Sequence, residues 1–211
     1  VDLTLGDPDI PTPQMIKDAA NKALAENKTK YTANAGIPEL REVISADVKK
    51  RTGITYSIDE IAVTAGAMGA LYLSTVSILN PTDEIIILEP HWPNYTNMVK
   101  MCGAKPKYVN YLGEDNLKNL TLNIEKAVTD KTRAIIINSP SNPTGVVLPF
   151  EKLEGIAEIA KKYNLWVITD EVYHTIVFDG SFRSILEIPN MKERTILVDS
   201  LSKRFSMTGF R

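Results

Sequence analysis

Ala134-Ile135-Ile136-Ile137 is a short, wholly apolar stretch, and it runs almost directly into the polar turn Ser139-Pro140-Ser141-Asn142-Pro143. A continuous apolar run of this length indicates a strand that is buried on both faces, because a half-exposed strand would alternate apolar and polar residues. The proline, serine and asparagine residues indicate a tight loop where the strand ends. This stretch therefore predicts an interior strand of a sheet that helices cover on both sides.

Further apolar runs of the same kind occur along the chain, at Ile61–Thr64, Ile85–Leu88, Lys107–Val109, Leu165–Ile168 and Ile196–Val198. Segments with helical periodicity alternate with them, at residues 13–27, 37–52, 67–79, 93–101 and 149–162. This alternation predicts an α/β fold with three layers, α/β/α, around a mainly parallel sheet. Residues 1–60 contain no strong strand, so we expect an N-terminal arm and the first helices there, and one large domain over residues 61–211.

Composition and charge exclude several classes of protein. The 211 residues are 44% hydrophobic and 24% charged, which is ordinary for a globular protein. Twenty-four Lys and Arg against 26 Asp and Glu, without long blocks of like charge, favour neither nucleic acid nor a membrane surface as partner. No apolar run approaches the roughly 18 residues of a membrane span, and Val1–Gly6 lacks the basic start of a signal peptide. Cys102 is the single cysteine and allows no internal disulfide, so we expect a cytoplasmic protein with a small-molecule partner.

Candidate ligand-binding residues follow five of the six predicted strands. They are Gly66, Trp92, Asn142, Asp170 and the stretch Ser200–Lys203. Parallel sheets bind their ligands at the carboxyl ends of the strands, and these ends meet at one edge of the sheet. We therefore expect these residues to gather in one site.

The loop Thr64-Ala65-Gly66-Ala67-Met68-Gly69-Ala70 joins a predicted strand to a predicted helix through small residues. Such a loop leaves backbone N–H groups at the helix start open to an anion, for example a phosphate. A plain turn that uses small residues for close packing has the same pattern, since the dinucleotide-binding Gly-x-Gly-x-x-Gly is absent. Trp92 is equally open: it suits the face of an aromatic ligand ring, or it packs against the core as loop aromatics commonly do.

Asn142 and Asp170 carry groups that suit a charged aromatic ligand. The amide of Asn142, in the turn Asn142-Pro143-Thr144-Gly145, can donate to a phenolate oxygen or bond only its own backbone. Asp170 ends an apolar strand, so its carboxylate must find a partner or face a pocket. A protonated pyridine nitrogen would be such a partner, and a helix N-cap role is the alternative.

Lys203 lies in Ser200-Leu201-Ser202-Lys203, eight residues before Arg211. Serine hydroxyls and a guanidinium suit a phosphate dianion, so a lysine beside them would meet a phosphate-bearing aldehyde. The alternative is a solvated surface lysine. The two histidines, His91 and His174, form no metal-ligand spacing with carboxylates, and no Gly-x-Ser-x-Gly elbow supports hydrolysis, so we expect no metal site.

Taken together, Asn142-Pro143-Thr144-Gly145, Asp170-Glu171-Val172-Tyr173 and Ser200-Leu201-Ser202-Lys203 with Arg211 closely resemble, in order and spacing, the class I/II aminotransferases of fold type I, which use pyridoxal 5'-phosphate (PLP). The resemblance implies that residues 61–211 are the PLP-binding large domain. It implies an aspartate aminotransferase-like enzyme that exchanges amino groups between an amino acid and a 2-oxo acid through a Schiff base on Lys203.

The resemblance also extends to Leu5-Gly6-Asp7-Pro8-Asp9 and to Tyr31-Thr32-Ala33-Asn34-Ala35-Gly36 with Leu40-Arg41, so it covers nearly all of the chain. It implies that Gly6 and Asn142 line the substrate site. In this family the residue that matches Tyr31 reaches the phosphate of the neighbouring subunit, which implies a homodimer.

Each remaining residue that matches the family has an implied role towards the cofactor. Lys203 would be the catalytic lysine, and Asp170 would pair with the pyridinium nitrogen. Asn142 and Tyr173 would contact the ring oxygen O3′, while Trp92 would stack on the ring. The other implied cofactor-binding residues, which lie mostly around the phosphate, are Gly66, Ala67, Met68, Ser200, Ser202 and Arg211.

The resemblance places the arginine for the substrate α-carboxylate in a C-terminal small domain, beyond Arg211. It also places an antiparallel strand, formed after Arg211, in the middle of the sheet. The chain does not begin with Met, so we expect it to be part of a longer enzyme, and we expect residues 1–211 alone to be inactive or poorly folded, with exposed sheet edges. A PLP-dependent β-elimination lyase on the same fold and a non-catalytic fragment that binds PLP weakly remain open alternatives.

Overall fold

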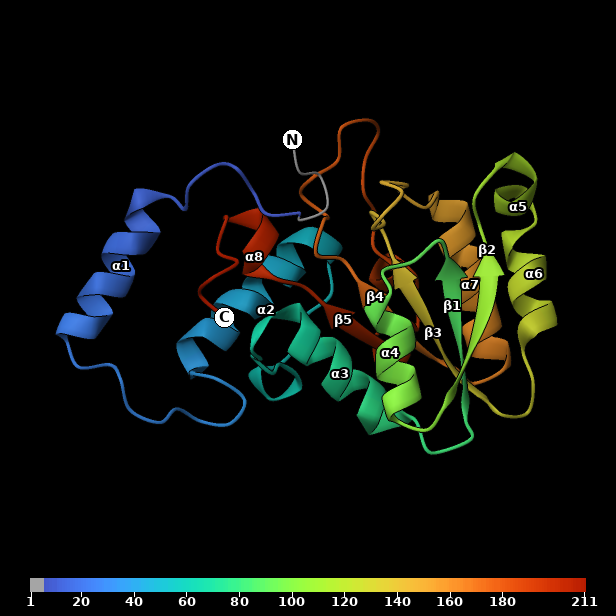
Figure 1. Ribbon diagram of the computed structural model, residues 1–211, viewed down its shortest axis with the longest axis horizontal. Helices are drawn as coiled ribbons and strands as arrows, with labels where there is room; N and C mark the ends of the chain where they lie inside the picture. Colours follow the sequence, from blue (N-terminus) through green and yellow to red (C-terminus); the bar gives the residue numbers. More distant parts are fainter. Residues whose placement is uncertain (1–5) are drawn as a thin grey trace.

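A five-stranded parallel sheet forms the centre of the computed structural model. The structure describes residues 6–211, so Val1–Leu5, including Leu5 of the motif Leu5-Gly6-Asp7-Pro8-Asp9, lie outside the described residues. The strands are β1 (Glu84–Glu89), β2 (Lys105–Asn110), β3 (Thr132–Asn138), β4 (Trp166–Asp170) and β5 (Thr195–Val198). Their order across the sheet is β2-β1-β3-β4-β5, and every neighbouring pair is parallel (Figure 1). The predicted parallel sheet is therefore confirmed.

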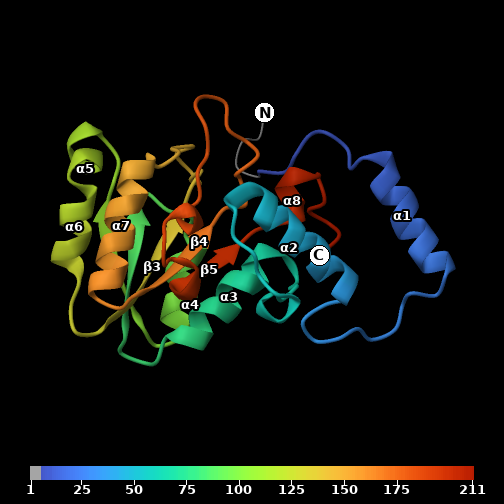
Figure 2. The ribbon, with the colours of Figure 1, turned by 180° about the vertical axis from the view of Figure 1, so that it is seen from behind.

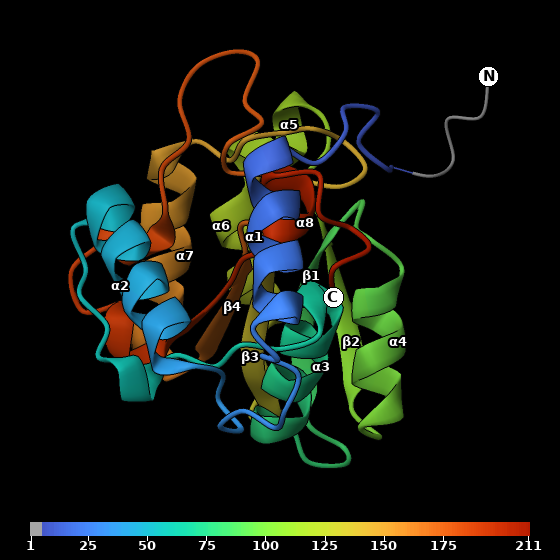
Figure 3. The ribbon, with the colours of Figure 1, turned by 90° about the vertical axis from the view of Figure 1, so that its left-hand side faces the viewer.

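Helices cover both faces of the sheet, as the uninterrupted apolar strands require. Helices α3 (Gly66–Ile78) and α4 (Asn94–Met101) lie on one face, and α6 (Leu120–Ala127) and α7 (Phe150–Lys162) lie on the other (Figures 1 and 2). Successive side chains of β1 point to opposite faces: Ile85 and Ile87 join the cluster under α3 and α4, whereas Ile86 and Leu88 join the cluster under α6 and α7. The three-layer architecture is thus confirmed, and Figure 3 shows the strands between α7 and α4.

The other elements are short or lie outside these layers. They are α1 (Gln14–Ala25), α2 (Pro38–Thr52), α5 (Glu114–Lys118), α8 (Leu201–Arg204) and three 3₁₀ turns at Ile58–Glu60, Ile185–Glu187 and Lys192–Arg194. Helix α1 has no buried residue and stands apart from the sheet (Figures 1 and 2), whereas α2 buries Val48. The division of the chain at residue 60 stays a prediction. Helices α5, α6 and α8, of five, eight and four residues, escaped sequence prediction.

The prediction of a strand at Ile61–Thr64 is wrong. This segment has an extended backbone at Ile61, with φ −120° and ψ 128°, but it joins no strand of the described sheet. The backbone N–H of Val63 donates instead to the carbonyl oxygen of Ala35, over 2.9 Å. An apolar run becomes a strand only where a neighbouring strand offers a ladder of hydrogen bonds. The described sheet ends at β5, and Ile61–Thr64 does not pair with it or with any other strand. Gly66 therefore follows an extended loop and not a strand.

The carboxyl ends of the strands place the predicted site residues together. Trp92 follows β1, Asn142 follows β3, Asp170 ends β4 and Ser200 follows β5. Within residues 6–211, no helix is long and apolar enough to cross a membrane.

Candidate active site

A cavity of about 810 Å³ lies where the loops at the carboxyl ends of β1, β3, β4 and β5 meet the start of α3. Pockets for small molecules typically measure roughly 300–1,000 Å³. Its wall contains most of the residues that the sequence singled out: Gly6, Ala67, Met68, Trp92, Asn142, Asp170, Tyr173, Ser200, Ser202, Lys203 and Arg211. Segments up to about two hundred residues apart therefore build one site, as the parallel topology predicts.

Asp170 presents a buried carboxyl group to this cavity. Its side chain is among the buried residues at 3% exposure, and burial raises the pKa of Asp170 to about 6, although a hydrogen bond from Tyr95 opposes the rise. The hydroxyl of Tyr95 donates to Oδ2 over 2.6 Å, and the backbone N–H of Val172 donates to Oδ1 over 3.3 Å. No helix begins at this point, so the N-cap interpretation does not apply. A carboxylate in this setting favours a cationic partner.

Asn142 and Tyr173 lie on the two loops beside Asp170 and interact through their side chains. Burial raises the pKa of the Tyr173 hydroxyl, and a hydrogen bond with Asn142 partly offsets this rise. Asn138, the last residue of β3, joins the two loops: its Oδ1 accepts from the backbone N–H of Asn142 over 2.7 Å, and its Nδ2 donates to the carbonyl of Asp170 over 3.0 Å. The backbone of Asn142 is thus held by Asn138 of β3, and its side chain bonds Tyr173 on the neighbouring loop.

Gly66 and Arg211 lie against each other at the start of α3. Gly66 starts α3 with φ +72°, and a Cβ atom there would overlap the guanidinium of Arg211. Arg211 donates to the carbonyl oxygens of Ala65, over 3.2 Å, and Thr208, over 3.1 Å, which holds it against the start of α3. The N–H groups of the first turn of a helix and a guanidinium both favour a phosphate. Ala67 and Met68 form the adjoining wall.

Lys203 is half-buried and donates from Nζ to the carbonyl oxygen of Gly6, so it is not a freely solvated lysine. Ser200 caps α8, since its hydroxyl accepts from the backbone N–H of Ser202 over 3.1 Å. Its own hydroxyl hydrogen stays available to a ligand. Trp92 packs against the core and also lines the cavity. Its ring meets that of Tyr95 edge-on, with the centroids 5.5 Å apart.

The structure does not bring Tyr31 to this cavity. Tyr31 is fully exposed on the loop between α1 and α2, so its implied contact requires a second subunit.

His91 lies between the rings of Tyr95 and Tyr108, and His174 bonds the carbonyl of Glu171 over 2.9 Å. Across the described part of the chain, no three His, Cys, Asp or Glu side chains are grouped as metal ligands would be.

Among the cavity residues that sequence reasoning missed, Tyr95 and Asn138 hydrogen-bond to Asp170. Asn138 pairs directly with Asp170 in the register of β3 and β4. Both are polar residues at the end of a buried strand, and this pattern in the sequence could have identified Asn138 as well as Asp170. Tyr95 had no such signal, because an apolar face of a helix commonly includes tyrosine. Only its bond to Asp170, 75 residues away, shows its place.

Known proteins resemble this chain along its whole length. Residues 1–211 match the family model described as "Aminotransferase class I and II". The "Probable aspartate/prephenate aminotransferase" of Thermus aquaticus is 39% identical, over 100% of this chain and 55% of the relative. The "Aspartate aminotransferase" of Sulfolobus acidocaldarius is 43% identical, over 100% of this chain and 53% of the relative. The crystal structure of an aromatic aminotransferase from Pyrococcus horikoshii OT3 has a TM-score of 0.95 and 42% identity, over 99% of this chain and 56% of that one. The chain spans about half the length of the curated relatives it matches.

Proposed function

Because this chain belongs to the aminotransferase class I and II family, we propose that it provides the cofactor site of a PLP-dependent aminotransferase, which exchanges amino groups between an amino acid and a 2-oxo acid. One observation carries the proposal. A single cavity is lined by Lys203, by Asp170 with its buried carboxyl group, and by Arg211, whose guanidinium packs against Gly66 at the start of α3.

These three groups suit three functional groups of PLP. The Lys203 amine suits the aldehyde, the Asp170 carboxylate suits the protonated ring nitrogen, and the start of α3 with Arg211 suits the phosphate. Ser200 and Ser202 add hydroxyl groups to the same wall, and Ala67 and Met68 add backbone N–H groups. When bound, PLP supplies a ring that withdraws electrons from the α-carbon of an amino acid.

The residues around the ring then have separate tasks. Asp170 places a negative charge beside the ring nitrogen, and Tyr95 lowers the pKa of that carboxyl, which favours the charged form. Lys203 can take the proton from the substrate α-carbon, since its amine lies in the cavity wall beside Gly6 and a free amine is a general base. Asn142 and Tyr173 would donate to the ring oxygen, and Trp92 would cover one face of the ring. Gly6 and Asn142 would border the substrate.

The substrate class, the assembly and the location are proposed from the relatives and from two single residues. Relatives are named for aspartate, prephenate and aromatic substrates, so we propose an amino acid of the dicarboxylic or aromatic class. The exposed Tyr31 supports a homodimer in which it reaches the neighbouring phosphate. The lone, half-buried Cys102 supports a cytoplasmic setting.

The test uses the full-length protein with added PLP. The parent should acquire visible absorbance from the bound cofactor, and Lys203→Ala should lose the band that depends on the lysine. Lys100→Ala, which removes an exposed lysine of α4, should keep it. Measuring both 2-oxo acid exchange and ammonia release over a panel of amino acids separates transamination from β-elimination, because a lyase releases ammonia without an amino acceptor. A parent protein that takes up no PLP would overturn the proposal.

A further inference from the structure

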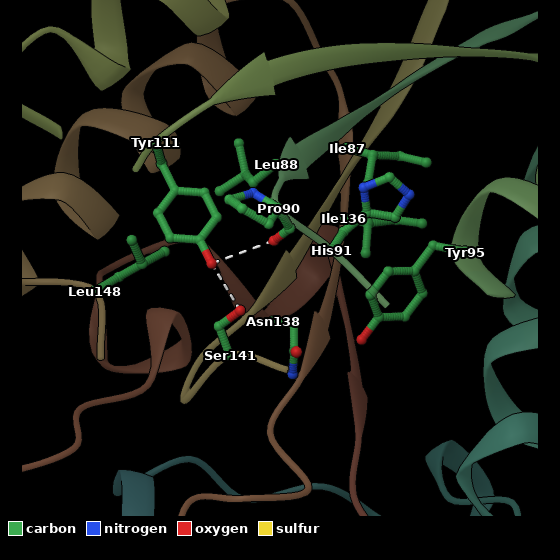
Figure 4. Close-up of a pocket in the computed structure, with 10 residues that line it drawn as sticks. All are labelled: Ile87, Leu88, Pro90, His91, Tyr95, Tyr111, Ile136, Asn138, Ser141 and Leu148. Carbon is green, nitrogen blue, oxygen red and sulfur yellow. Dashed lines mark hydrogen bonds between the residues drawn. The ribbon is translucent and has the colours of Figure 1, made fainter. Parts of the chain in front are cut away.

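The hydroxyl group of Tyr111 connects two loops of the active site (Figure 4). Tyr111 follows β2, and its side chain is only 4% exposed. Its oxygen lies 2.7 Å from the hydroxyl of Ser141, 2.7 Å from that of Thr144 and 3.2 Å from the carbonyl oxygen of Pro90. The side chain therefore reaches from the edge strand β2, past the end of β1, to the loop after β3.

The chemistry of these groups sets the direction of each hydrogen bond. The carbonyl of Pro90 can only accept, so Tyr111 donates its single hydroxyl hydrogen there. The hydroxyls of Ser141 and Thr144 then donate to the phenol oxygen. Replacing this oxygen would leave all three groups without their partner, and the gap beside them, about 10 Å³, has room for about one water molecule at most.

The partners of Tyr111 flank residues that face the large cavity. Ser141 and Thr144 lie on the two sides of Asn142, and Pro90 lies two residues before Trp92. The turn around Asn142 is also closed by a bond from the N–H of Gly145 to the carbonyl of Ser141, over 2.8 Å. Tyr111 itself does not line that cavity.

We propose that Tyr111 is a positioning residue, which fixes the Asn142 turn and the Trp92 loop in the geometry that the cofactor ring requires. Its effect on PLP rests on the proposed function, whereas its effect on the loops does not. The structural effect is therefore testable in the cofactor-free protein.

The first test measures amide hydrogen exchange in the cofactor-free, full-length protein. Tyr111→Phe should speed exchange by about ten-fold or more in peptides covering residues 139–146, because Ser141 and Thr144 each lose a hydrogen bond and one such bond contributes on the order of three- to ten-fold. Tyr108→Phe is the matched control. It removes the hydroxyl of a half-exposed tyrosine on β2 that bonds Thr96 over 3.0 Å, away from the Asn142 turn, and should leave these peptides unchanged.

The second test measures PLP binding and the pH titration of the visible band of the bound cofactor. Tyr111→Phe should weaken binding about three- to ten-fold. It should also raise the midpoint pH of the band, because a loosened Asn142 donates less well to the negatively charged ring oxygen. A variant that lost only overall stability would leave the midpoint unchanged.

Identical exchange in the Asn142 turn for Tyr111→Phe and Tyr108→Phe would overturn the proposal, whatever the protein does with PLP. If Tyr111→Phe exchanges faster but the parent protein takes up no PLP, Tyr111 still holds the loops, and the proposed function is overturned. Unchanged PLP binding and midpoint beside faster exchange would overturn its positioning role towards the ring.

Discussion

At Asp170, burial and hydrogen bonding act on the carboxyl group in opposite directions. Burial raises its pKa to about 6, while the bonds from Tyr95 and the Val172 N–H favour the ionised form. The folded state thus holds this proton more tightly than the unfolded chain, in which the pKa is near 3.8. Without a cationic partner, ionising Asp170 must cost stability.

This cost predicts a dependence on pH that Asp170→Asn removes. In the cofactor-free parent, the contribution of Asp170 to the free energy of unfolding should be fully present below pH 4 and be lost as the pH rises through about 6. The difference between variant and parent should therefore rise by about 2 kcal/mol between pH 4 and pH 7. Urea denaturation at a series of pH values measures this difference, with Asp179→Asn, which replaces an exposed aspartate, as the control. Parallel curves for parent and Asp170→Asn would contradict the prediction.

Among the elements, helix α2 is attached to the end of β4 by a buried ion pair between Arg51 and Glu171. The side chains are 14% and 1% exposed, and Glu171 also accepts from the hydroxyl of Ser184 over 2.6 Å. Arg51 further lies 3.6 Å from a carboxylate oxygen of Asp199, which precedes the Ser200–Lys203 segment. One helix thus supports the segments that follow β4 and β5, which carry Tyr173 and Lys203.

Removing the cation of this pair should be costly. Arg51→Met leaves a buried carboxylate, and we expect it to lower the free energy of unfolding by about 3–5 kcal/mol at pH 8. Burial already raises the pKa of Glu171 and Arg51 lowers it, so the variant should raise that pKa further. The loss should therefore be smaller at pH 5, where Glu171 can take up a proton.

The control for Arg51→Met is Arg204→Met, which breaks the more exposed pair of Arg204 with Asp47, also on α2. This pair lies closer to solvent than that of Arg51 and Glu171, so its loss should cost less, on the order of 1 kcal/mol. Equal losses for the two variants in chemical denaturation would show that Arg51 acts as an ordinary surface cation.

For the whole molecule, the described residues leave two sheet edges and a detached helix. The edge strand β2 carries Lys105, Pro106 and Lys107, which discourage pairing with another strand. The edge strand β5 (Thr195–Val198) has no such protection. On α1, Met15 and Leu24 are 77% and 62% exposed.

We therefore expect residues 1–211, produced alone, to self-associate and not to transaminate. Size-exclusion chromatography with light scattering measures the association, and the full-length protein is the reference. Replacing Met15 and Leu24 with lysine should raise the monomer fraction, because it removes exposed apolar surface from α1. A monodisperse, transaminating 211-residue protein would contradict the expectation.

The sequence alone was enough for those features that depend on local pattern. The uninterrupted apolar run of β3 predicted a covered parallel strand, and polar residues directly after strands predicted the cavity wall at Asn142, Asp170 and Lys203. The same reasoning failed at Ile61–Thr64, because an apolar run does not say whether a strand lies beside it.

Only the tertiary structure decided which side chains meet across the chain. Tyr95 bonds Asp170 across 75 residues, Arg51 bonds Glu171 across 120, and Tyr111 joins the loops after β1 and β3. These contacts depend on the order and register of strands and on how helices pack over them, which no local period encodes. The sequence therefore predicted the residues that line the cavity, whereas the residues that hold them in place could be identified only from the tertiary structure.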